Sequence, residues 1–204
     1  MKKKIFVLLL PLLVAAWLSS CHKDKDANKT IIQGHVTEYG TDAPIQGARV
    51  YLWCANGEIF GPTGSSFIDS LVTDAEGAFH TEYLDRELCG GVYLSAYKEG
   101  FFYKSDIDIH GGVNDLEVVL DPEAWLKIVT IPDIGIYHLS IGGDFMGASG
   151  FDVYSSDGLQ EHLFQTRGNR MKQIFWREWG MVDQTLLDSI FVHHLDTTVY
   201  IIHY

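Results

Sequence analysis

The chain lacks many of the residues and motifs on which common protein classes depend. It has only three cysteines and five prolines, and no Cys-x-x-Cys spacing of the kind found in zinc and redox sites. It contains no His-Glu-x-x-His or His-x-His sequence, and no Gly-x-Ser-x-Gly sequence of a serine hydrolase. These absences argue against the common zinc, redox and hydrolase classes. We therefore expect no cofactor, no metal and no enzymatic activity.

Positive charge is scarce as well. The sequence has 15 Lys and Arg against 27 Asp and Glu. Residues 1–20 contain three of the lysines and none of the acidic residues, so the remainder of the chain carries a formal net charge of −15. Nucleic acids and anionic lipid surfaces attract proteins of the opposite charge. Neither is expected to be held through charge, and nucleic acid is excluded as a partner.

Only one long apolar run is present, from Ile5 to Leu18, and it directly follows three lysines. Its 14 residues fall short of the roughly 20 that a membrane-spanning helix needs, and Pro11 interrupts it. A basic start, a short apolar stretch and small residues at the end are the parts of a secretory signal peptide. We expect residues 1–20 to be such a signal peptide and not a transmembrane anchor.

The end of this run, Leu18-Ser19-Ser20-Cys21, resembles the lipobox of bacterial lipoproteins. The resemblance implies that Cys21 is acylated and becomes the first residue of the mature chain. The alternative is a soluble secreted protein in which Cys21 has no special role. Each methylene of an acyl chain contributes about 0.8 kcal/mol when it is buried in a bilayer, so several chains would hold the protein durably. The expected location is the outer membrane, with a lipid anchor.

Residues 21–30 form the expected tether between this anchor and the folded part. Up to Lys29 the segment has no apolar side chain larger than alanine after the cysteine, so it cannot bury enough surface to order itself. Asp24 and Asp26 lie close to the cysteine and resemble surface-export signals of some lipoproteins, although lysines interleave with them. Exposure on the cell surface is therefore a hypothesis, which protease treatment of intact cells would test.

Residues 31–120 have the pattern of short strands joined by turns. From Ala48 to Cys54 every second residue is apolar and small or aliphatic, while the intervening ones are charged or aromatic. This is the period of a strand with one buried face. Asp74–Gly77 is a turn signal that precedes another such run. Short strands, frequent turns and no helical period predict an all-β sandwich.

Four segments of this first half carry a family resemblance. They combine turn glycines with an Asp-x-x-Gly-x-Phe sequence, and they look like the carboxypeptidase regulatory-like domain. The segments are Gln33–Val36, Ala43–Val50, Thr73–Phe79 and Lys98–Phe101. The resemblance implies a transthyretin-like, prealbumin-type sandwich, in which Phe79 fits a core position. That domain is mostly a non-catalytic module, so it implies binding or spacing and transfers no chemistry.

Residues 121–204 are predicted to form a second β-sandwich, without a recognised family motif. Strands are expected over residues 125–131, 137–141, 159–166 and 171–179. Arg167–Arg170 predicts a hairpin turn between the last two of these strands. A final hairpin is expected over residues 188–204, turning at Leu195-Asp196, and a short helical turn is considered for Gln184–Leu187. No repeat period is strong enough to relate the two halves.

Cys54 and Cys89 are the only cysteines left once Cys21 is acylated. In an exported protein an even pair suggests a disulfide. A bridge that closes a loop of about 35 residues stabilises a fold by roughly 3 to 4 kcal/mol in the chain-entropy account. Two buried free thiols are the alternative, because free cysteine is among the residues most often found in protein interiors.

Aromatic side chains are the main candidates for ligand contact. Phe101-Phe102-Tyr103 follows a turn glycine near one end of the first sandwich, where the loops of such folds commonly bind, although one or two of these rings should be buried. Trp176 is a further candidate, since with Trp179, Phe175 and Tyr154 it could form a platform for sugar rings. The two tryptophans lie three residues apart in an expected strand, so they face opposite ways and at most one is exposed. Core packing is the alternative for each.

Two groups of potential metal ligands are better explained without a metal. Asp106, Asp108 and His110 alternate along one face of an expected strand, but no calcium-type loop accompanies them, so we interpret them as a solvated face. His193 and His194, with His203, are the second group, but His193 and His194 are adjacent in an expected strand and therefore point to opposite faces. The predicted set of metal ligands is empty.

The sequence therefore predicts a lipid-anchored outer-membrane protein with two tandem all-β sandwich domains, the first transthyretin-like. The expected function is non-catalytic: binding, adhesion or an accessory role through contact with a protein at the envelope. The alternative is a glycan-binding accessory subunit of a surface polysaccharide-uptake system, and the least favoured is a cryptic hydrolase. Exposed coplanar aromatics in a groove would favour the glycan, and a deep pocket joining His and carboxylates would favour the hydrolase.

Overall fold

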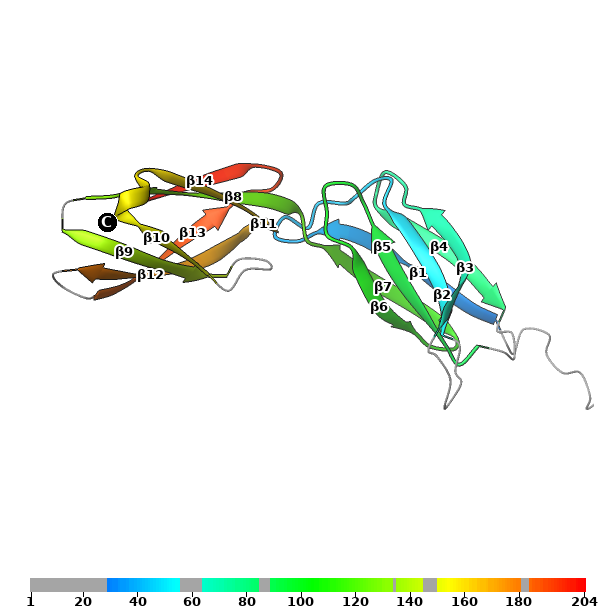
Figure 1. The fold of residues 1–204 in the computed structure, drawn as a ribbon. Coiled ribbons are helices and arrows are strands. Elements are labelled where there is room, and N and C mark those ends of the chain that lie inside the picture. Colours follow the sequence, from blue (N-terminus) through cyan, green and yellow to red (C-terminus); the bar gives the residue numbers. More distant parts are fainter. Residues whose placement is uncertain (1–28, 56–63, 85–88, 134, 145–149, 181–183) are drawn as a thin grey trace, which may run out of the picture.

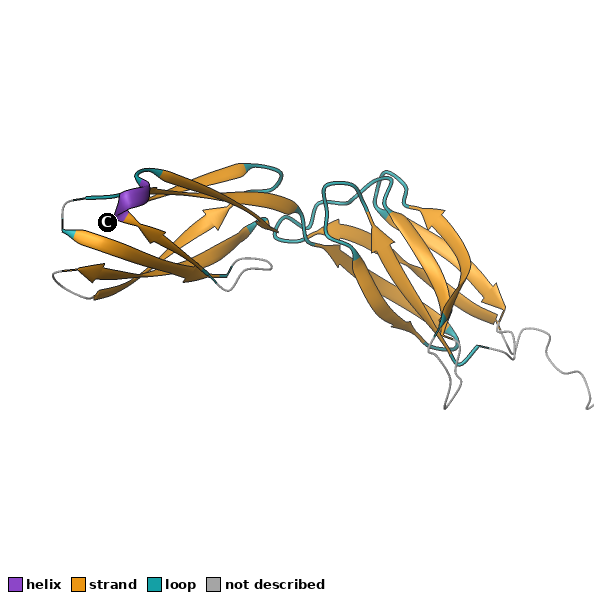
Figure 2. Ribbon diagram, in the orientation of Figure 1, coloured by secondary structure: helices purple, strands orange, loops and turns teal. Residues whose placement is uncertain are grey.

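The structure of the chain is a computed structural model that describes residues 29–204, with gaps at 56–63, 85–88, 134, 145–149 and 181–183. The described residues form two β-sandwiches arranged end to end (Figures 1 and 2). A single 3₁₀ turn, Ser155–Asp157, is the exception to strand structure in this part of the chain. The predicted all-β fold with tandem sandwiches is confirmed. The signal peptide and Cys21 lie outside the described residues.

The first sandwich contains seven described strands in two sheets. They are β1 (Lys29–Glu38), β2 (Arg49–Ala55), β3 (Ser65–Val72), β4 (Ala78–Leu84), β5 (Gly91–Tyr97), β6 (Lys104–Ile109) and β7 (Val113–Leu120). One sheet has the order β4-β1-β7 and the other the order β3-β2-β5-β6. Strand β1 pairs antiparallel with β4 and parallel with β7.

Alternation along each strand divides the side chains between a core and a solvent face. On β2, Val50 and Leu52 are buried between the two sheets, whereas Tyr51 and Trp53 point to the outer side. The facing sheet also contributes to this core, since Ile32 and other β1 residues are fully buried. The hydrophobic effect therefore fixes which face of each strand points inward, since a shift of one residue would expose the whole set.

The turn before β4 shows how the Asp-x-x-Gly-x-Phe sequence works. The Asp74 carboxylate accepts hydrogen bonds from the backbone N–H groups of Glu76 and Ala78, at 3.1 and 2.7 Å. Gly77 has φ +73°, a conformation that glycine adopts without steric cost. The turn delivers Phe79 to the core, where it is buried as the resemblance implies.

The second sandwich also contains seven described strands. They are β8 (Glu123–Ile131), β9 (Ile136–Gly143), β10 (Phe151–Tyr154), β11 (Gln160–Arg167), β12 (Arg170–Gly180), β13 (Gln184–Val192) and β14 (Thr197–His203). One sheet has the order β11-β8-β14 and the other the order β10-β9-β12-β13. Its core is separate from that of the first sandwich and includes Leu126, Leu139 and Ile174.

Both sandwiches have the same topology. The first strand of each, β1 or β8, pairs antiparallel with the fourth and parallel with the seventh. The second strand of each, β2 or β9, lies between the third and the fifth, and the sixth follows the fifth. The two halves are thus structural counterparts, a relationship that the strand order shows and that no sequence period indicates.

Two predicted hairpins are wrong. Strands β11 and β12, which flank the turn at Arg167–Arg170, belong to different sheets, because β11 pairs with β8 whereas β12 pairs with β9 and β13. Strands β13 and β14, which flank Leu195-Asp196, are likewise in different sheets. Each turn carries the chain from one layer of the sandwich to the other. The helical turn considered for Gln184–Leu187 is also wrong, since these residues begin β13.

Cys54 near the end of β2 and Cys89, two residues before β5, form a disulfide with Cα atoms 5.5 Å apart. Strands β2 and β5 are paired neighbours, and Cys54 lies opposite Val92 in their register. The bridge therefore fastens two adjacent strands at the end of the first sandwich that is farther from the second (Figure 1).

The two sandwiches meet at a junction centred on Glu38, the last residue of β1, which is only 7% exposed. Its Oε1 accepts a hydrogen bond of 2.6 Å from Asn169 Nδ2 and lies 2.5 Å from His194 Nδ1. Asn169 also donates to the Tyr39 carbonyl at 3.1 Å and accepts a bond of 3.2 Å from the backbone N–H of His194. A buried carboxylate of the first sandwich is thus satisfied by side chains of the second.

A second set of contacts flanks Glu38 at the junction. The Arg170 guanidinium forms an ion pair with Asp121 and stacks over the ring of Tyr39, with its Cζ 4.1 Å from the ring centroid. Arg167 Nε lies 3.4 Å from the other carboxylate oxygen of Asp121. The backbone N–H of Glu123 donates to the Gly100 carbonyl at 2.8 Å. These contacts hold the two sandwiches in a defined relative orientation.

The substitution Asn169→Gly is expected to loosen this junction. Asn169 has φ +53°, which glycine accepts, so the change removes the three side-chain hydrogen bonds without adding backbone strain. The contact between the two sandwiches is expected to lose about 2 kcal/mol of stabilising free energy. Small-angle X-ray scattering should then report a wider distribution of interdomain angles. Asp42→Gly, at another turn position with positive φ, is the control, and equal scattering from both variants would contradict the role of Asn169.

Candidate functional site

The predicted contact run Phe101-Phe102-Tyr103 lies at the junction. Phe101 is buried in the first core and meets the His194 ring edge-on, with centroids 5.4 Å apart. The Arg167 guanidinium lies over Phe102, 5.9 Å from its centroid. Of the three, Tyr103 is the ring that is largely exposed. The run mainly joins the two sandwiches, and one ring is buried, as we expected.

The predicted ligand contact by Trp176 needs correction. Its side chain faces the interior of the second sandwich and packs against that core, with its ring centroid 6.2 Å from that of Tyr200. Its indole N–H donates to Glu178 Oε1 at 3.2 Å. Trp179 stands on the opposite, outer face of the same sheet, where it stacks with His138. The two tryptophans face opposite ways, and Trp179 is the one that lies on the outer face.

The outer face of the sheet β10-β9-β12-β13 brings together the side chains of the candidate site. Along each strand the residues next to the site residues, such as Leu139 and Ile174, point into the core. The site residues therefore point outward. Cross-strand pairing aligns them in three adjacent rows. The aromatic row is Tyr154, His138 and Trp179; the polar row is Asp152, Ser140, Arg177 and Thr185; the recessed row is Gly142, Phe175 and Leu187.

In the aromatic row the rings stand against one another. The His138 ring stacks on Tyr154 with centroids 4.7 Å apart and on Trp179 at 6.1 Å, with interplanar angles of 10° and 15°. The Arg177 guanidinium covers Trp179, with its Cζ 3.8 Å from the ring centroid. The faces of His138 and Trp179 are therefore occupied within the protein. The rings of this row therefore present their edges to solvent, and they do not form the flat aromatic platform that the sequence suggested.

The polar row presents acceptors and donors next to each other. Ser140 Oγ donates a hydrogen bond of 2.5 Å to Asp152 Oδ1, and His138 Nε2 lies 3.1 Å from the same oxygen. The bond from Ser140, assisted by His138, lowers the pKa of Asp152 below its ordinary value of 3.8. Asp152 is therefore a carboxylate at neutral pH. Arg177 and Thr185 add guanidinium donors and a hydroxyl on the neighbouring strands.

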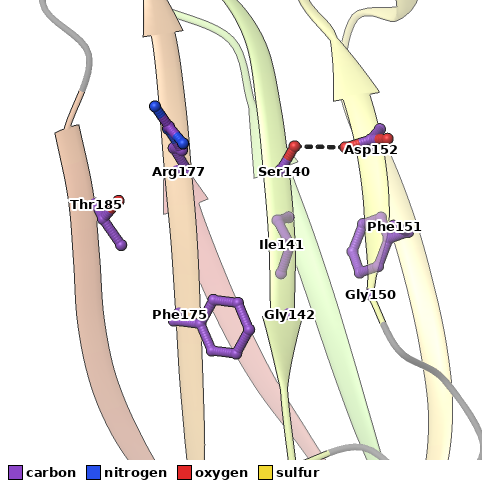
Figure 3. Close-up of a pocket in the computed structure, with 9 residues that line it drawn as sticks. All are labelled: Ser140, Ile141, Gly142, Gly150, Phe151, Asp152, Phe175, Arg177 and Thr185. Atoms are coloured by element: carbon purple, nitrogen blue, oxygen red, sulfur yellow. Dashed lines mark hydrogen bonds between the residues drawn. The ribbon is translucent and has the colours of Figure 1, made fainter.

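A shallow hollow of about 440 Å³ lies over the polar and recessed rows. Figure 3 shows the residues that line it. Its lining consists of Ser140, Ile141, Gly142, Gly150, Phe151, Asp152, Phe175, Arg177 and Thr185. The Phe175 ring lies across Gly142, where an added Cβ would come within 2.2 Å of the ring. A glycine at this position is what lets the ring lie flat and keeps the surface recessed.

His138, Asp152 and Ser140 have the composition of a catalytic triad but not its geometry. In a triad the histidine lies between the other two, with one ring nitrogen toward the serine and the other toward the carboxylate. Here Ser140 Oγ and Asp152 Oδ1 both lie near Nε2 of His138, at 3.5 and 3.1 Å, and the serine hydroxyl donates directly to the carboxylate. This arrangement does not prepare Ser140 as a nucleophile.

Within the described part of the chain, no group of three or more His, Cys, Asp or Glu side chains is placed to hold a metal ion. Asp106 has φ +60° at a register shift in β6, so it departs from the alternation that the sequence suggested. His194 belongs to the junction, whereas the His193 ring packs against the Phe191 ring, with the two ring centroids 4.9 Å apart. No helix among the described residues has the length and apolar character to cross a membrane.

Comparisons with known proteins show no family. No family model matches the chain, and no curated protein matches it. Among solved structures it is similar to the TIE protein of Bacillus anthracis, with a TM-score of 0.37 and 10% identity over 86% of this chain and 34% of that one. For a streptococcal ancillary pilin the TM-score is 0.34 and the identity 12%, over 88% of this chain and 63% of that one. For a DUF3823 family protein from Parabacteroides merdae the TM-score is 0.33 and the identity 13%, over 83% of this chain and 100% of that one.

These similarities are low in both identity and TM-score, so they carry no functional conclusion. The chain also spans only about a third of the TIE protein and less than two thirds of the pilin.

Proposed function

We propose that this protein is a non-catalytic binding protein of the cell envelope, held at the outer membrane by acylated Cys21. The outer face of the sheet β10-β9-β12-β13 is its ligand-binding surface. The observation that carries the proposal is the hollow beside the polar row (Figure 3), which lies in the sandwich farther along the chain from Cys21. Strand β1 supports this placement, since it begins at Lys29 near the anchor and ends at the junction with Glu38.

The aromatic row does not form the flat platform that would favour a glycan, but the polar and recessed rows beside it fit a glycan better than any other ligand class. Sugar hydroxyls both donate and accept hydrogen bonds, and the polar row offers the Asp152 carboxylate, the Arg177 guanidinium and the Thr185 hydroxyl side by side. The exposed ring of Phe175, lying over Gly142, supplies an apolar floor for the C–H face of a pyranose. A concave, partly apolar surface with a few convergent polar groups is the usual form of a small-molecule site.

Contact with a partner protein is the second candidate, and a different face favours it. The outer face of the sheet β11-β8-β14 exposes Leu163, Val199 and Ile201, each at least half exposed. Leu163 and Val199 both pair with Lys127 on the central strand, and Ile201 pairs with Val129 beside it. These apolar side chains surround the ion pair of Lys127 with Glu161, and such a mixed patch suits a protein surface better than a sugar.

A glycan array probed with the mature chain carrying Cys21→Ser tests the proposal. Arg177→Met keeps an unbranched apolar stem and removes the guanidinium donors, and Phe175→Ala removes the apolar floor. Each is expected to weaken binding at least about tenfold, or about 1.4 kcal/mol. Leu163→Ser, on the opposite sheet, is the matched control and should bind as the parent does. No glycan signal, together with a crosslinked protein partner that Leu163→Ser loses, would replace the glycan with the protein contact.

A further inference from the structure

Among the described strand residues of the first sandwich, outward-facing Phe, Trp and Tyr side chains occur on one of the two sheets only. The outer face of β3-β2-β5-β6 carries five aromatic rings: Phe67, Trp53, Tyr51, Tyr93 and Tyr97. The outer face of β4-β1-β7 carries instead mainly polar and charged side chains, among them Gln33, His35, His80, Glu82, Asp115 and Glu117. Because the two faces share one core, packing alone does not explain why the aromatic residues gather on one side.

Four of these residues form a tether-end cluster, defined as Phe67, Trp53, Tyr93 and Tyr51. Register aligns the first three across β3, β2 and β5. The Trp53 ring meets Phe67 edge-on with centroids 5.7 Å apart and lies 6.2 Å from the Tyr51 ring. The indole N–H of Trp53 donates to Ser95 Oγ at 2.8 Å, which fixes the ring on the sheet. Phe67, at the edge, is 54% exposed.

The cluster lies at the end of the sandwich where the tether enters. Trp53 is two residues from the end of β2, and its partner Tyr93 lies opposite Asp108, next to the end of β6. The turn after β6 bonds back to the start of β1, since the Ile31 N–H donates to the Gly112 carbonyl at 2.8 Å. Figure 1 shows the start of β1 and the end of β2 at this same end.

The length of the tether limits how far this end can stand from a membrane. Seven residues separate Cys21 from Lys29, where β1 begins. A fully extended chain spans at most about 3.5 Å per residue, so Lys29 lies within about 28 Å of the acylated cysteine. Along the strands, the cluster lies about two residues, or roughly 7 Å, from this end of the sandwich. A tilt of the sandwich is enough to bring its rings to the bilayer surface.

We propose that the tether-end cluster rests in the interfacial layer of the membrane that carries the acyl chains. This inference depends on the acylation of Cys21 in the proposed function. Tryptophan and tyrosine favour this layer because each joins an apolar ring to a polar group. Asp108 beside Tyr93 and the net negative charge of the chain give no attraction to anionic lipid, so the contact is with neutral, zwitterionic lipid.

The test uses the mature, acylated protein in phosphatidylcholine vesicles whose acyl chains are brominated near the headgroup. Bromine should quench part of the tryptophan emission, and Trp53→Phe should abolish that quenched part while the signal of the other tryptophans persists. Phe67→Ser, which retains Trp53, should reduce the quenching. Tyr97→Ser, on the same face but next to the junction, is the matched control and should leave the quenching unchanged.

The mass of the N-terminal peptide separates failure of this inference from failure of the anchor. Acylated protein that shows no quenching, or equal quenching in Trp53→Phe, would overturn the membrane contact and leave the anchor intact. An unmodified Cys21 would overturn the anchor itself. Nuclear magnetic resonance shifts at Trp53 and Tyr93 on addition of an oligosaccharide, without quenching by lipid, would show that the cluster is a glycan surface instead.

Discussion

Replacing Gly34 with valine is expected to unfold the first sandwich and leave the second folded. Gly34 lies in the middle of β1, opposite Phe79 of β4 and Leu116 of β7. A Cβ at this position would come within 2.0 Å of the Leu116 carbonyl oxygen, and strands paired on both sides cannot move away from it. We expect a loss of more than about 4 kcal/mol, at the upper end of single-residue effects.

Hydrogen exchange followed by mass spectrometry measures the two sandwiches separately. In Gly34→Val, peptides from β1, β4 and β7 should lose protection, whereas peptides from β8 and β12 should keep it. Gly91→Val is the matched control, because an added Cβ at Gly91, also a strand residue of the first sandwich, meets nothing within 4 Å. Normal protection of β1 in Gly34→Val would mean that the parallel pairing of β1 with β7 is wrong.

The sequence predicted the strands better than it predicted their partners. Alternation around Val50 and Leu52 identifies a strand and its buried face, because burial is a property of each residue and its neighbours. The turn at Arg167–Arg170 has residues typical of a hairpin, with Asn169 at φ +53°. The same local chemistry also serves a crossing between layers, so turn composition cannot decide whether the next strand pairs with the last one.

Strand β10 and the full length of β3 were missed for a different reason. Glycine-rich or serine-rich segments precede both strands, and the strands predicted for the second half leave residues 142–158 unassigned. Phe151–Tyr154 does alternate, with Val153 buried and Asp152 and Tyr154 exposed. A run of only four residues is too short to stand out beside a glycine-rich bend. The missing strand carried two members of the candidate site.

The candidate site depends on register, which is why sequence reasoning found only part of it. Tyr154, Phe175 and Trp179 were recognised as aromatic candidates, but Asp152, Ser140 and Arg177 were not. Those three polar residues lie far apart in the chain and become neighbours only through the pairing of β10, β9 and β12. Hydrogen bonds such as that from Ser140 to Asp152 follow from this pairing.

The matching topology of the two sandwiches connects the site to the tether-end cluster. The sheet β3-β2-β5-β6 is the counterpart of β10-β9-β12-β13, and each carries aromatic side chains on its outer face. The first has Trp53 and Phe67 near the tether, and the second has Trp179 beside the hollow. The counterpart sheets of the two sandwiches thus both carry aromatic residues on their outer faces, and the junction at Glu38 fixes how these two faces are placed relative to each other.

Removing the disulfide is expected to destabilise the first sandwich by about 4 kcal/mol in the variant Cys54→Ala/Cys89→Ala. The bridge spans a sequence separation of 35 residues, and the chain-entropy account assigns about this value to a loop of that length. Alanine avoids an unpaired thiol at either position. Urea denaturation should show an earlier first transition, because the two cores are separate, and an unchanged second transition.

The disulfide can also be checked by counting free thiols and by the quenching measurement with brominated lipid. Denatured protein carrying Cys21→Ser should show no free thiol before reduction, since Cys54 and Cys89 are bridged. Equal urea midpoints for the parent and the double variant would contradict the stabilising role of the bridge. Because Trp53 directly precedes Cys54, loosening this end should also broaden the position of the tether-end cluster. Quenching by brominated lipid should then fall in the acylated double variant, although the second sandwich remains intact.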